Sequence, residues 1–138
     1  MSSIVLDDAT RAYVAGYLDG EGCFFAYGHH RYGIVCENTH RPTVEWLQEL
    51  FGGNVTICKG RKSNHRTTYR WVVVGNEAAA VCKVIAPFLK EKWRSATIII
   101  MFNHTTGLPL VGRNIHPEVK EARMKLVSMM KDQKRVSW

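Results

Sequence analysis

The sequence predicts an α+β domain with an αββαββα core, in which one four-stranded antiparallel sheet carries its helices on a single face. Two observations lead to this prediction. Short runs rich in β-branched and aromatic residues occur in two pairs, each joined by a turn or a loop. Stretches with helical period stand before, between and after those pairs. Because helices on one face leave the other face open, a ligand is expected to bind on the open face.

The first half of the chain is expected to form a helix, a hairpin and a second helix. Asp7 or Asp8 can cap the first helix. Gly20 and Gly22 are expected to end it, because glycine is typical of helix C-termini. Pro42 suits the first turn of the second helix. The predicted elements are helix 8–19, strand 23–27, turn 28–31, strand 32–37 and helix 41–51.

A second hairpin and three further helices are expected in the second half. Asn76 is expected to cap a helix that runs toward Pro87. The predicted elements are strand 55–59, loop 60–66, strand 67–74, helix 78–85, helix 92–104, loop 105–116 and a last helix that opens at Pro117. The inward side of that last helix is expected to carry Val119, Ala122, Leu126, Val127 and Met130. We expect one domain over 1–138, with a core at 8–104 and an extra C-terminal loop and helix at 105–138.

The charge pattern favours a polyanionic partner. The net charge is +7 and the sequence pI is about 9.4, which makes nucleic acid the first candidate, although a merely solvated basic surface has the same composition. No acidic residue occurs between Glu49 and Glu77. The basic residues of that interval are Lys59, Arg61, Lys62, Arg66 and Arg70. Such a block of one sign beside predicted strands is typical of a loop that follows a phosphate backbone.

Hydropathy and cysteine content indicate an intracellular protein. No apolar run reaches the roughly 20 residues that span a membrane, so no membrane partner is expected. The first eight residues lack the basic start of a secretory signal, so we expect a cytoplasmic protein, or an organellar one if an organelle encodes it. The four cysteines form no C-x-x-C pair and no usual zinc spacing. They are expected to be reduced thiols in or near the core.

One face of the first predicted helix consists of small residues. Its members recur at i, i+3, i+4 and i+7, and they are Ala12, Ala15, Gly16 and Asp19. A stripe without bulk lets a second backbone approach closely. Glycine inside a helix costs about 1 kcal/mol relative to alanine, so Gly16 indicates a close contact. This stripe therefore predicts a dimer interface, while Val14 and Leu18 on the other side point toward the core.

Acidic residues and glycines alternate at the end of this helix, from Asp19 to Gly22. An acid beside glycines leaves carboxylate and carbonyl oxygens accessible together, and hard divalent cations such as Mg²⁺ prefer oxygen ligands. Two copies of the helix would bring two carboxylates together, which is unfavourable unless cations lie between them. Metal-bound carboxylates over a phosphate are typical of phosphodiester hydrolysis. An ordinary helix stop and turn would show the same short pattern.

The longer string Val-Ala-Gly-Tyr-Leu-Asp-Gly-Glu-Gly at 14–22 resembles the signature of the LAGLIDADG homing endonucleases. Three later segments also resemble that family in the same order: residues 45–53 its second helix and glycine stop, 69–71 its fourth strand, and 87–92 its Pro-aromatic-Leu-x-x-Lys segment. The resemblance covers about residues 8–104. It implies a saddle-shaped sheet over the DNA major groove.

The resemblance also implies roles for residues near the motif. Glu21 would bind the catalytic Mg²⁺ and Gly20 would lend a carbonyl to it, while Asp19 would stabilise the helix ends. The family more often has Asp where Glu21 stands, which puts the rate in doubt. Lys92 would polarise the scissile phosphate or a nearby water, with Arg94 as the alternative, and an exposed lysine at a helix start would look the same. Asn38, or else Glu37, would position the water network.

A single motif implies a homodimer, which would carry +14, twice +7. The expected activity is Mg²⁺-dependent cleavage of a long, near-palindromic double-stranded DNA target with short 3′ overhangs. Mn²⁺ would substitute, Ca²⁺ would bind without supporting cleavage, and no small-molecule cofactor is expected. Candidate DNA contacts are Tyr27, His29, Arg31, Gly33, Val35, Lys59, Arg61, Lys62, Arg66 and Arg70, with His30 and His65 as further possibilities. The alternative is a non-cleaving nucleic-acid-binding protein or intron maturase on the same scaffold.

Overall fold

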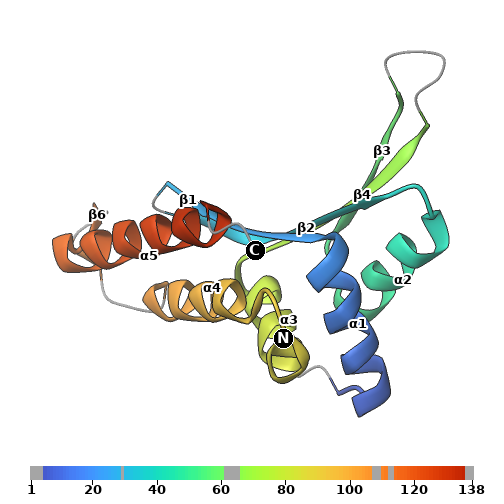
Figure 1. The fold of residues 1–138 in the computed structure, drawn as a ribbon. Coiled ribbons are helices and arrows are strands. Elements are labelled where there is room, and N and C mark those ends of the chain that lie inside the picture. Colours follow the sequence, from blue (N-terminus) through green and yellow to red (C-terminus); the bar gives the residue numbers. More distant parts are fainter. Residues whose placement is uncertain (1–4, 29, 61–65, 107–109, 112–113, 136–138) are drawn as a thin grey trace.

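A computed structural model of the chain describes residues 5–28, 30–60, 66–106, 110–111 and 114–135 (Figure 1). Its elements follow the predicted order of helix, hairpin, helix, hairpin and helices. They are α1 (Asp8–Glu21), β1 (Gly22–Tyr27), β2 (Arg31–Asn38), α2 (Arg41–Phe51), β3 (Asn54–Cys58), β4 (Thr68–Val74), α3 (Gly75–Ile85), the 3-10 helix η1 (Ala86–Phe88), α4 (Trp93–Thr105), β5 (Leu110–Val111), β6 (Asn114–Ile115) and α5 (Pro117–Arg135).

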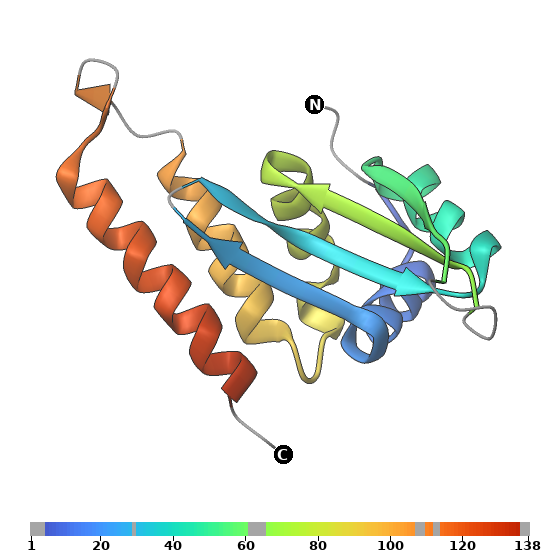
Figure 2. The same cartoon turned by 90° about the horizontal axis from the view of Figure 1, so that it is seen from above.

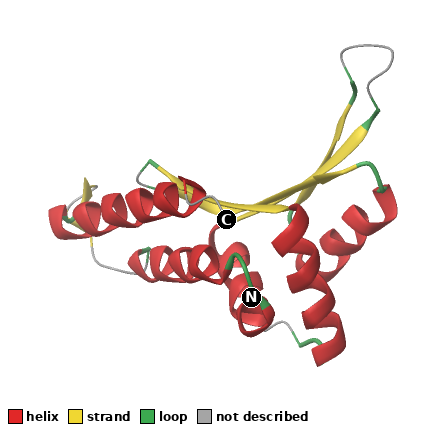
Figure 3. Cartoon of the chain, in the orientation of Figure 1, coloured by secondary structure: helices red, strands yellow, loops and turns green. Residues whose placement is uncertain are grey.

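Strands β1 to β4 form one antiparallel sheet in the order β1-β2-β4-β3. Helices α1 to α4 lie beneath this sheet, and its other face is open, which confirms the predicted α+β fold (Figures 1 and 3). Helix α5 lies beside α4, along the β1 edge of the sheet (Figure 2). The sheet bends where the β3–β4 hairpin rises away from the helices (Figure 1).

The two faces of the sheet differ in burial because side chains alternate along each strand. The helix-facing side is fully covered and forms the core, with Phe24, Ala26, Ile34, Cys36, Trp71 and Val73. The Trp71 indole nitrogen donates to the Gly52 carbonyl oxygen at 2.8 Å, which ties β4 to the end of α2. The alternate positions, such as Val35 and Arg70, face the open side.

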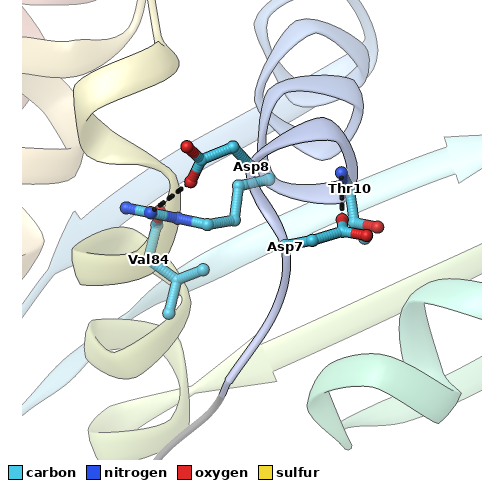
Figure 4. Close-up of polar contacts among 5 residues, drawn as sticks. Asp7, Asp8, Thr10 and Val84 are labelled. Carbon is cyan, nitrogen blue, oxygen red and sulfur yellow. Dashed lines mark hydrogen bonds and ion pairs between the residues drawn. The ribbon is translucent and has the colours of Figure 1, made fainter.

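Helix α1 is held at its start by capping and by a contact to α3 (Figure 4). The Asp7 carboxylate accepts a hydrogen bond from the Thr10 amide at 2.8 Å, so Asp7 is the N-cap. The hydrogen bond holds the pKa of this carboxyl below its usual range. Arg11 donates from Nε to the Val84 carbonyl oxygen at 2.8 Å and pairs with Asp8 at 3.1 Å.

The end of α1 differs from the prediction. The helix continues through Gly20 to Glu21, and Gly22 is the C-cap, whereas an end near Asp19 was expected. A Cβ atom at Gly22 would lie only 2.9 Å from the Leu18 carbonyl oxygen. Glycine at this position therefore lets the chain turn back tightly from α1 into β1, and Glu21 becomes the last helical residue.

Helix α3 also begins differently from the prediction. Val74 is its N-cap and Gly75 its first residue, so the expected cap at Asn76 is wrong. Gly75 has a φ of 64°, which lets β4 pass directly into the helix. The Asn76 side chain instead accepts a hydrogen bond from the Asn103 amide nitrogen at 2.7 Å, and Asn103 also contacts the Tyr32 hydroxyl.

Helix α5 buries Leu126 and Met130 as expected, but Ala122 is exposed and Arg123 is buried in its place. The Arg123 guanidinium donates to the Thr105 hydroxyl at 2.8 Å and to the Thr105 carbonyl oxygen at 3.1 Å. It thereby gives a hydrogen-bond donor to a carbonyl group at the end of α4, where the last carbonyl groups lack helical partners. A short β5–β6 hairpin occupies part of the predicted 105–116 loop.

The four cysteines are free thiols in different settings. Cys36 and Cys82 are buried, and burial raises the pKa of both thiols. Cys58 is half-buried, whereas Cys23 is exposed, so the expectation of a place in or near the core is wrong for Cys23. Among the described helices, none has the length and hydrophobicity needed to cross a membrane.

Candidate functional site

The site lies where α1 ends at the sheet (Figure 1). Gly20 and Glu21 form the last turn of the helix and both are exposed. A Cβ atom at Gly20 would meet nothing within 4 Å, so a ligand can approach the backbone there. Helix C-termini leave carbonyl oxygens without helical partners. The end of α1 therefore presents an exposed carboxylate, Glu21, beside the exposed backbone of Gly20.

Lys92 is brought against this helix end from the segment before α4. Its ammonium nitrogen donates to the Gly22 carbonyl oxygen at 2.6 Å and to the Leu18 carbonyl oxygen at 3.3 Å. The side chain is half-buried and Lys92 is the N-cap residue of α4. A positive charge at a helix C-terminus is favourable, because the helix dipole is negative there. The structure thus places Lys92 beside the residues that flank Glu21.

Asp19 holds the same two segments together from the other side. Its carboxylate accepts hydrogen bonds from the backbone amides of Lys90, Glu91 and Lys92, at 2.7, 3.3 and 3.0 Å. These amides precede α4, so the Asp19 carboxylate holds the backbone of residues 90–92 against the end of α1. This arrangement matches the stabilising role that the resemblance implied for Asp19.

A tyrosine and a thiol lie beneath the site. The Tyr17 hydroxyl is buried, and burial raises the pKa of Tyr17, with further contributions from Cys36 and Glu21. The pKa of Cys36 is raised first by burial; Glu21 raises it further and Lys92 opposes that shift. Both groups therefore lie within the electrostatic influence of Glu21, and Cys36 also within that of Lys92.

The candidates for positioning water lie at the end of β2. Asn38 is half-buried, pairs with Tyr69 across the sheet, and accepts a hydrogen bond from the His40 amide at 2.9 Å. Glu37 faces the open side, where it accepts a hydrogen bond from the Thr68 hydroxyl at 3.0 Å and lies opposite Arg70. Of the two, Glu37 is the side chain on the open face.

Arg94, the alternative to Lys92, contacts the Trp93 ring instead of the end of α1. Its guanidinium lies 5.1 Å from the centre of the Trp93 ring, and the side chain is exposed. No described hydrogen bond joins it to the end of α1, whereas Lys92 makes two. Lys92 is therefore the basic residue of this site in the described structure.

Several predicted DNA contacts share the open face of the sheet or its margins. Tyr27, Arg31, Val35 and Arg70 occupy positions on that face, and Lys59 and Arg66 are exposed at the two ends of the β3–β4 loop. Gly33 is buried: a Cβ atom there would lie 3.0 Å from the Phe25 ring. His29, Arg61, Lys62 and His65 lie outside the described residues.

The exposed face of α1 differs from the predicted stripe. Ala15 is fully buried in the core of its own protomer, so its assignment to a dimer contact is wrong. Ala12 and Gly16 are exposed, and a Cβ atom at Gly16 would meet nothing within 4 Å. Ala9 and Tyr13 share this exposed face, as their helical spacing from Gly16 would have predicted.

Within the described residues of one protomer, few potential metal ligands lie close together. Across the part of the chain that the structure describes, no three His, Cys, Asp or Glu side chains come together as a metal cluster. Mg²⁺ in proteins is commonly held by one or two carboxylates, with waters and substrate phosphates completing the shell. One carboxylate at Glu21 beside the Gly20 backbone fits that kind of shared site.

Comparison with known proteins shows what the fold resembles. None of the curated proteins compared with the chain matches it. Among solved structures, the homing endonuclease I-CvuI in complex with DNA has a TM-score of 0.72 at 18% identity, over 94% of this chain and 84% of that one. The archaeal intron-encoded homing endonuclease I-Vdi141I, complexed with DNA, has a TM-score of 0.66 at 21% identity, over 95% and 87%.

A third structure, the homing endonuclease I-TnaI, matches with a TM-score of 0.54 at 18% identity, over 91% of this chain and 93% of that one. At these identities the likeness concerns the fold. The family model of the LAGLIDADG-like domain matches residues 8–85, which is more than half of the chain and includes all of α1 and the four main strands. The chain therefore belongs to the family of LAGLIDADG-like domain proteins.

Proposed function

We propose that this protein is a site-specific endonuclease that hydrolyses double-stranded DNA as a homodimer with Mg²⁺. The observation that carries the proposal is the Lys92 ammonium, which lies 2.6 Å from the carbonyl oxygen of Gly22, the residue that follows the exposed Glu21. A carboxylate, accessible carbonyl oxygens and a fixed cation are the groups that phosphodiester hydrolysis needs.

Each group has a separate task in the proposed reaction. Glu21 and the Gly20 carbonyl oxygen would hold Mg²⁺, which supplies Lewis-acid charge to the scissile phosphate when bound. Lys92 would stabilise negative charge that develops on the phosphate oxygens. Its two bonds to carbonyl oxygens hold the ammonium in place, so little reorganisation is needed. Asn38, or else Glu37 on the open face, would orient water.

The exposed face of α1 supports the dimer. Packing within the protomer does not require glycine at position 16, because a Cβ atom at Gly16 would meet nothing within 4 Å. Such a position fits close approach by a second helix, as at small-residue helix contacts. Two copies paired along Ala12 and Gly16 would bring their Glu21 residues together at one end. The two carboxylates would then share cations over the DNA.

The open face of the sheet supports DNA as the partner. Arg31 and Arg70 lie on it, and Lys59 and Arg66 stand at the loop beside it. Strands in the major groove can read base edges, while cations at the margins contact phosphates. The two fold relatives that were solved with DNA, I-CvuI and I-Vdi141I, are consistent with this partner.

Cleavage of a plasmid tests the proposal. The plasmid carries the uninterrupted form of the DNA that flanks the gene in its source genome. Wild-type protein should linearise it in Mg²⁺ or Mn²⁺ and only bind it in Ca²⁺. Glu21→Gln should lower the cleavage rate at least about 100-fold and keep its affinity in Ca²⁺. Glu118→Gln, an exposed acid on α5, is the matched control.

Two outcomes would contradict the proposal. Cutting by Glu21→Gln at the wild-type rate would remove Glu21 from the site. Tight DNA binding without any cutting by the wild-type protein in either metal would instead favour a non-cleaving binding protein or maturase on the same scaffold.

A further inference from the structure

A basic cleft lies next to the end of α1, and of its charged lining residues only Lys92 has a task in the reaction proposed above. It has a volume of about 840 Å³ and lies between the start of β1, the segment before α4 and the C-terminal end of α5. Its charged lining residues are Lys90, Glu91, Lys92, Arg94 and Lys134. Four cations against one carboxylate make the cleft strongly positive, so an anionic ligand is expected there.

An exposed aromatic ring stands in the wall of this cleft. Trp93, the first residue of α4, is 46% exposed, although large aromatic side chains usually bury most of their surface. The Arg94 guanidinium lies over its ring at 5.1 Å and holds it in a cationic setting. Exposed aromatic rings beside cations are typical of sites where unpaired bases stack and phosphates are neutralised.

Double-stranded DNA cannot use all the groups that line this cleft, because its bases are stacked on one another and their faces are not accessible. Its phosphates could meet the cations, but the Trp93 ring would have no base to stack on. An unpaired nucleotide offers both a free base face and a phosphate. The combination of Trp93 with Lys134 and Arg94 therefore fits single-stranded nucleic acid better than a duplex.

The position of the cleft indicates where such a strand comes from. Gly22 and Lys92 belong to its lining and are also the two partners of the 2.6 Å contact at the end of α1. The cleft therefore begins beside the proposed cleavage site and continues toward Lys134. Staggered cutting of a duplex leaves unpaired nucleotides at that point.

We infer that the cleft binds the single-stranded DNA end released by cleavage, with Trp93 stacking on an unpaired base and Lys134 contacting its phosphate. This inference rests on the proposed endonuclease function for the source of the strand. Its chemistry, an unpaired nucleotide with its phosphate, depends only on the cleft.

Binding of short oligonucleotides tests the inference. A fluorescently labelled single-stranded DNA of about six nucleotides is titrated with the full chain in Ca²⁺, and anisotropy reports its affinity. Trp93→Leu should weaken binding about 10- to 100-fold, since base–aromatic stacking is worth about 1–3 kcal/mol. Lys134→Gln should weaken it several-fold and lower its salt dependence. Met101→Ala on α4 and Lys131→Gln on α5, both exposed and outside the cleft, are the matched controls.

Each outcome decides between supporting and overturning the inference. Loss of single-strand affinity in both cleft variants, with neither control affected, supports it. Unchanged affinity in Trp93→Leu, or equal loss in the controls, overturns it. Tighter binding of an RNA of the same sequence than of the DNA also overturns it, in favour of an RNA ligand.

A separate titration with duplex DNA keeps the two proposals distinguishable. If the wild-type protein neither binds nor cuts duplex DNA, yet binds single strands through Trp93, the proposed function fails while the cleft assignment stands. If duplex cutting proceeds and no single strand binds, the cleft assignment alone fails.

Discussion

The Lys92 ammonium nitrogen lies 2.6 Å from the Gly22 carbonyl oxygen, so a side chain that precedes α4 is fixed against the residue that ends α1. The same side chain reaches the Leu18 carbonyl oxygen at 3.3 Å. Together with the hydrogen bonds that the Asp19 carboxylate accepts from the amides before α4, this contact joins the two helix ends into one unit. Several measurable consequences depend on that unit.

Lys92→Met is expected to lower the cleavage rate about 100- to 1000-fold, the usual effect of removing one charged or hydrogen-bonding group that stabilises a transition state. Target affinity in Ca²⁺ should change less than about threefold, because the ammonium faces the helix end rather than the sheet. Single-turnover cleavage and equilibrium binding measure the two effects. Lys83→Met, an exposed lysine on α3, should behave like wild type, and an equal loss in that variant would exclude a local role for Lys92.

Asp19→Ala is expected to lower the free energy of unfolding by about 2 kcal/mol, because three backbone amides lose a charged acceptor that is partly open to solvent. Urea denaturation at equilibrium measures this change. Asp8→Ala, which removes only an exposed pair with Arg11, should change it by less than about 0.5 kcal/mol. Equal stability of Asp19→Ala and wild type would show that these bonds are not formed in solution.

Substitutions at Gly16 are expected to separate folding from association. Gly16→Ala should stabilise a single protomer by up to about 1 kcal/mol, since alanine favours helix and its Cβ meets nothing there. Gly16→Leu should abolish the dimer, because its bulk would hold two helices apart. Sedimentation equilibrium gives the association constant. Ala122→Leu, on the exposed side of α5, should leave it unchanged, and a persistent dimer in Gly16→Leu would refute the α1 contact.

The thiols are expected to differ in reactivity with pH. Burial raises the pKa of Cys36 and of Cys82, so both stay protonated as the pH rises through the range in which an ordinary thiol ionises. Because the unfolded thiols ionise at a lower pH than the folded ones, the free energy of unfolding is unaffected below the pKa of the unfolded thiol and falls as the pH rises above it. Titration with a disulfide reagent at pH 8 to 9 should modify Cys23 rapidly and the buried pair only after unfolding. Rapid modification of Cys82 in the native protein would contradict its burial.

The order of elements could be predicted from the sequence because periodicity reports burial locally. Val14 and Leu18, one turn apart, marked the core side of α1, and both are fully buried. Ala15 was assigned to the wrong side, since it lies at the border of the apolar stripe and its burial depends on neighbouring elements. The missed start of α3 at Gly75 has a similar cause, because a positive φ depends on how β4 enters the helix.

The candidate site could be predicted only where its residues lie close together in the sequence. Gly20 and Glu21 lie within one motif, so a short pattern was enough to single them out as candidates. Lys92 became a candidate only through a second segment of family resemblance, and its contact with Gly22 joins residues far apart in the chain. The cleft beside it was not predicted at all. It exists because α5 returns along β1, a long-range packing that no local pattern contains.

The hydrogen bonds between the end of α1 and residues 90–92 span 70 to 74 residues of sequence. Closing so long a loop costs chain entropy, which later contacts must offset, so this junction is expected to form late in folding. A chain still emerging from the ribosome would carry the acidic motif long before the lysine that complements it. The proposed cleavage activity would therefore require completion of both hairpins. A prematurely terminated chain would contain the acidic motif but lack Lys92.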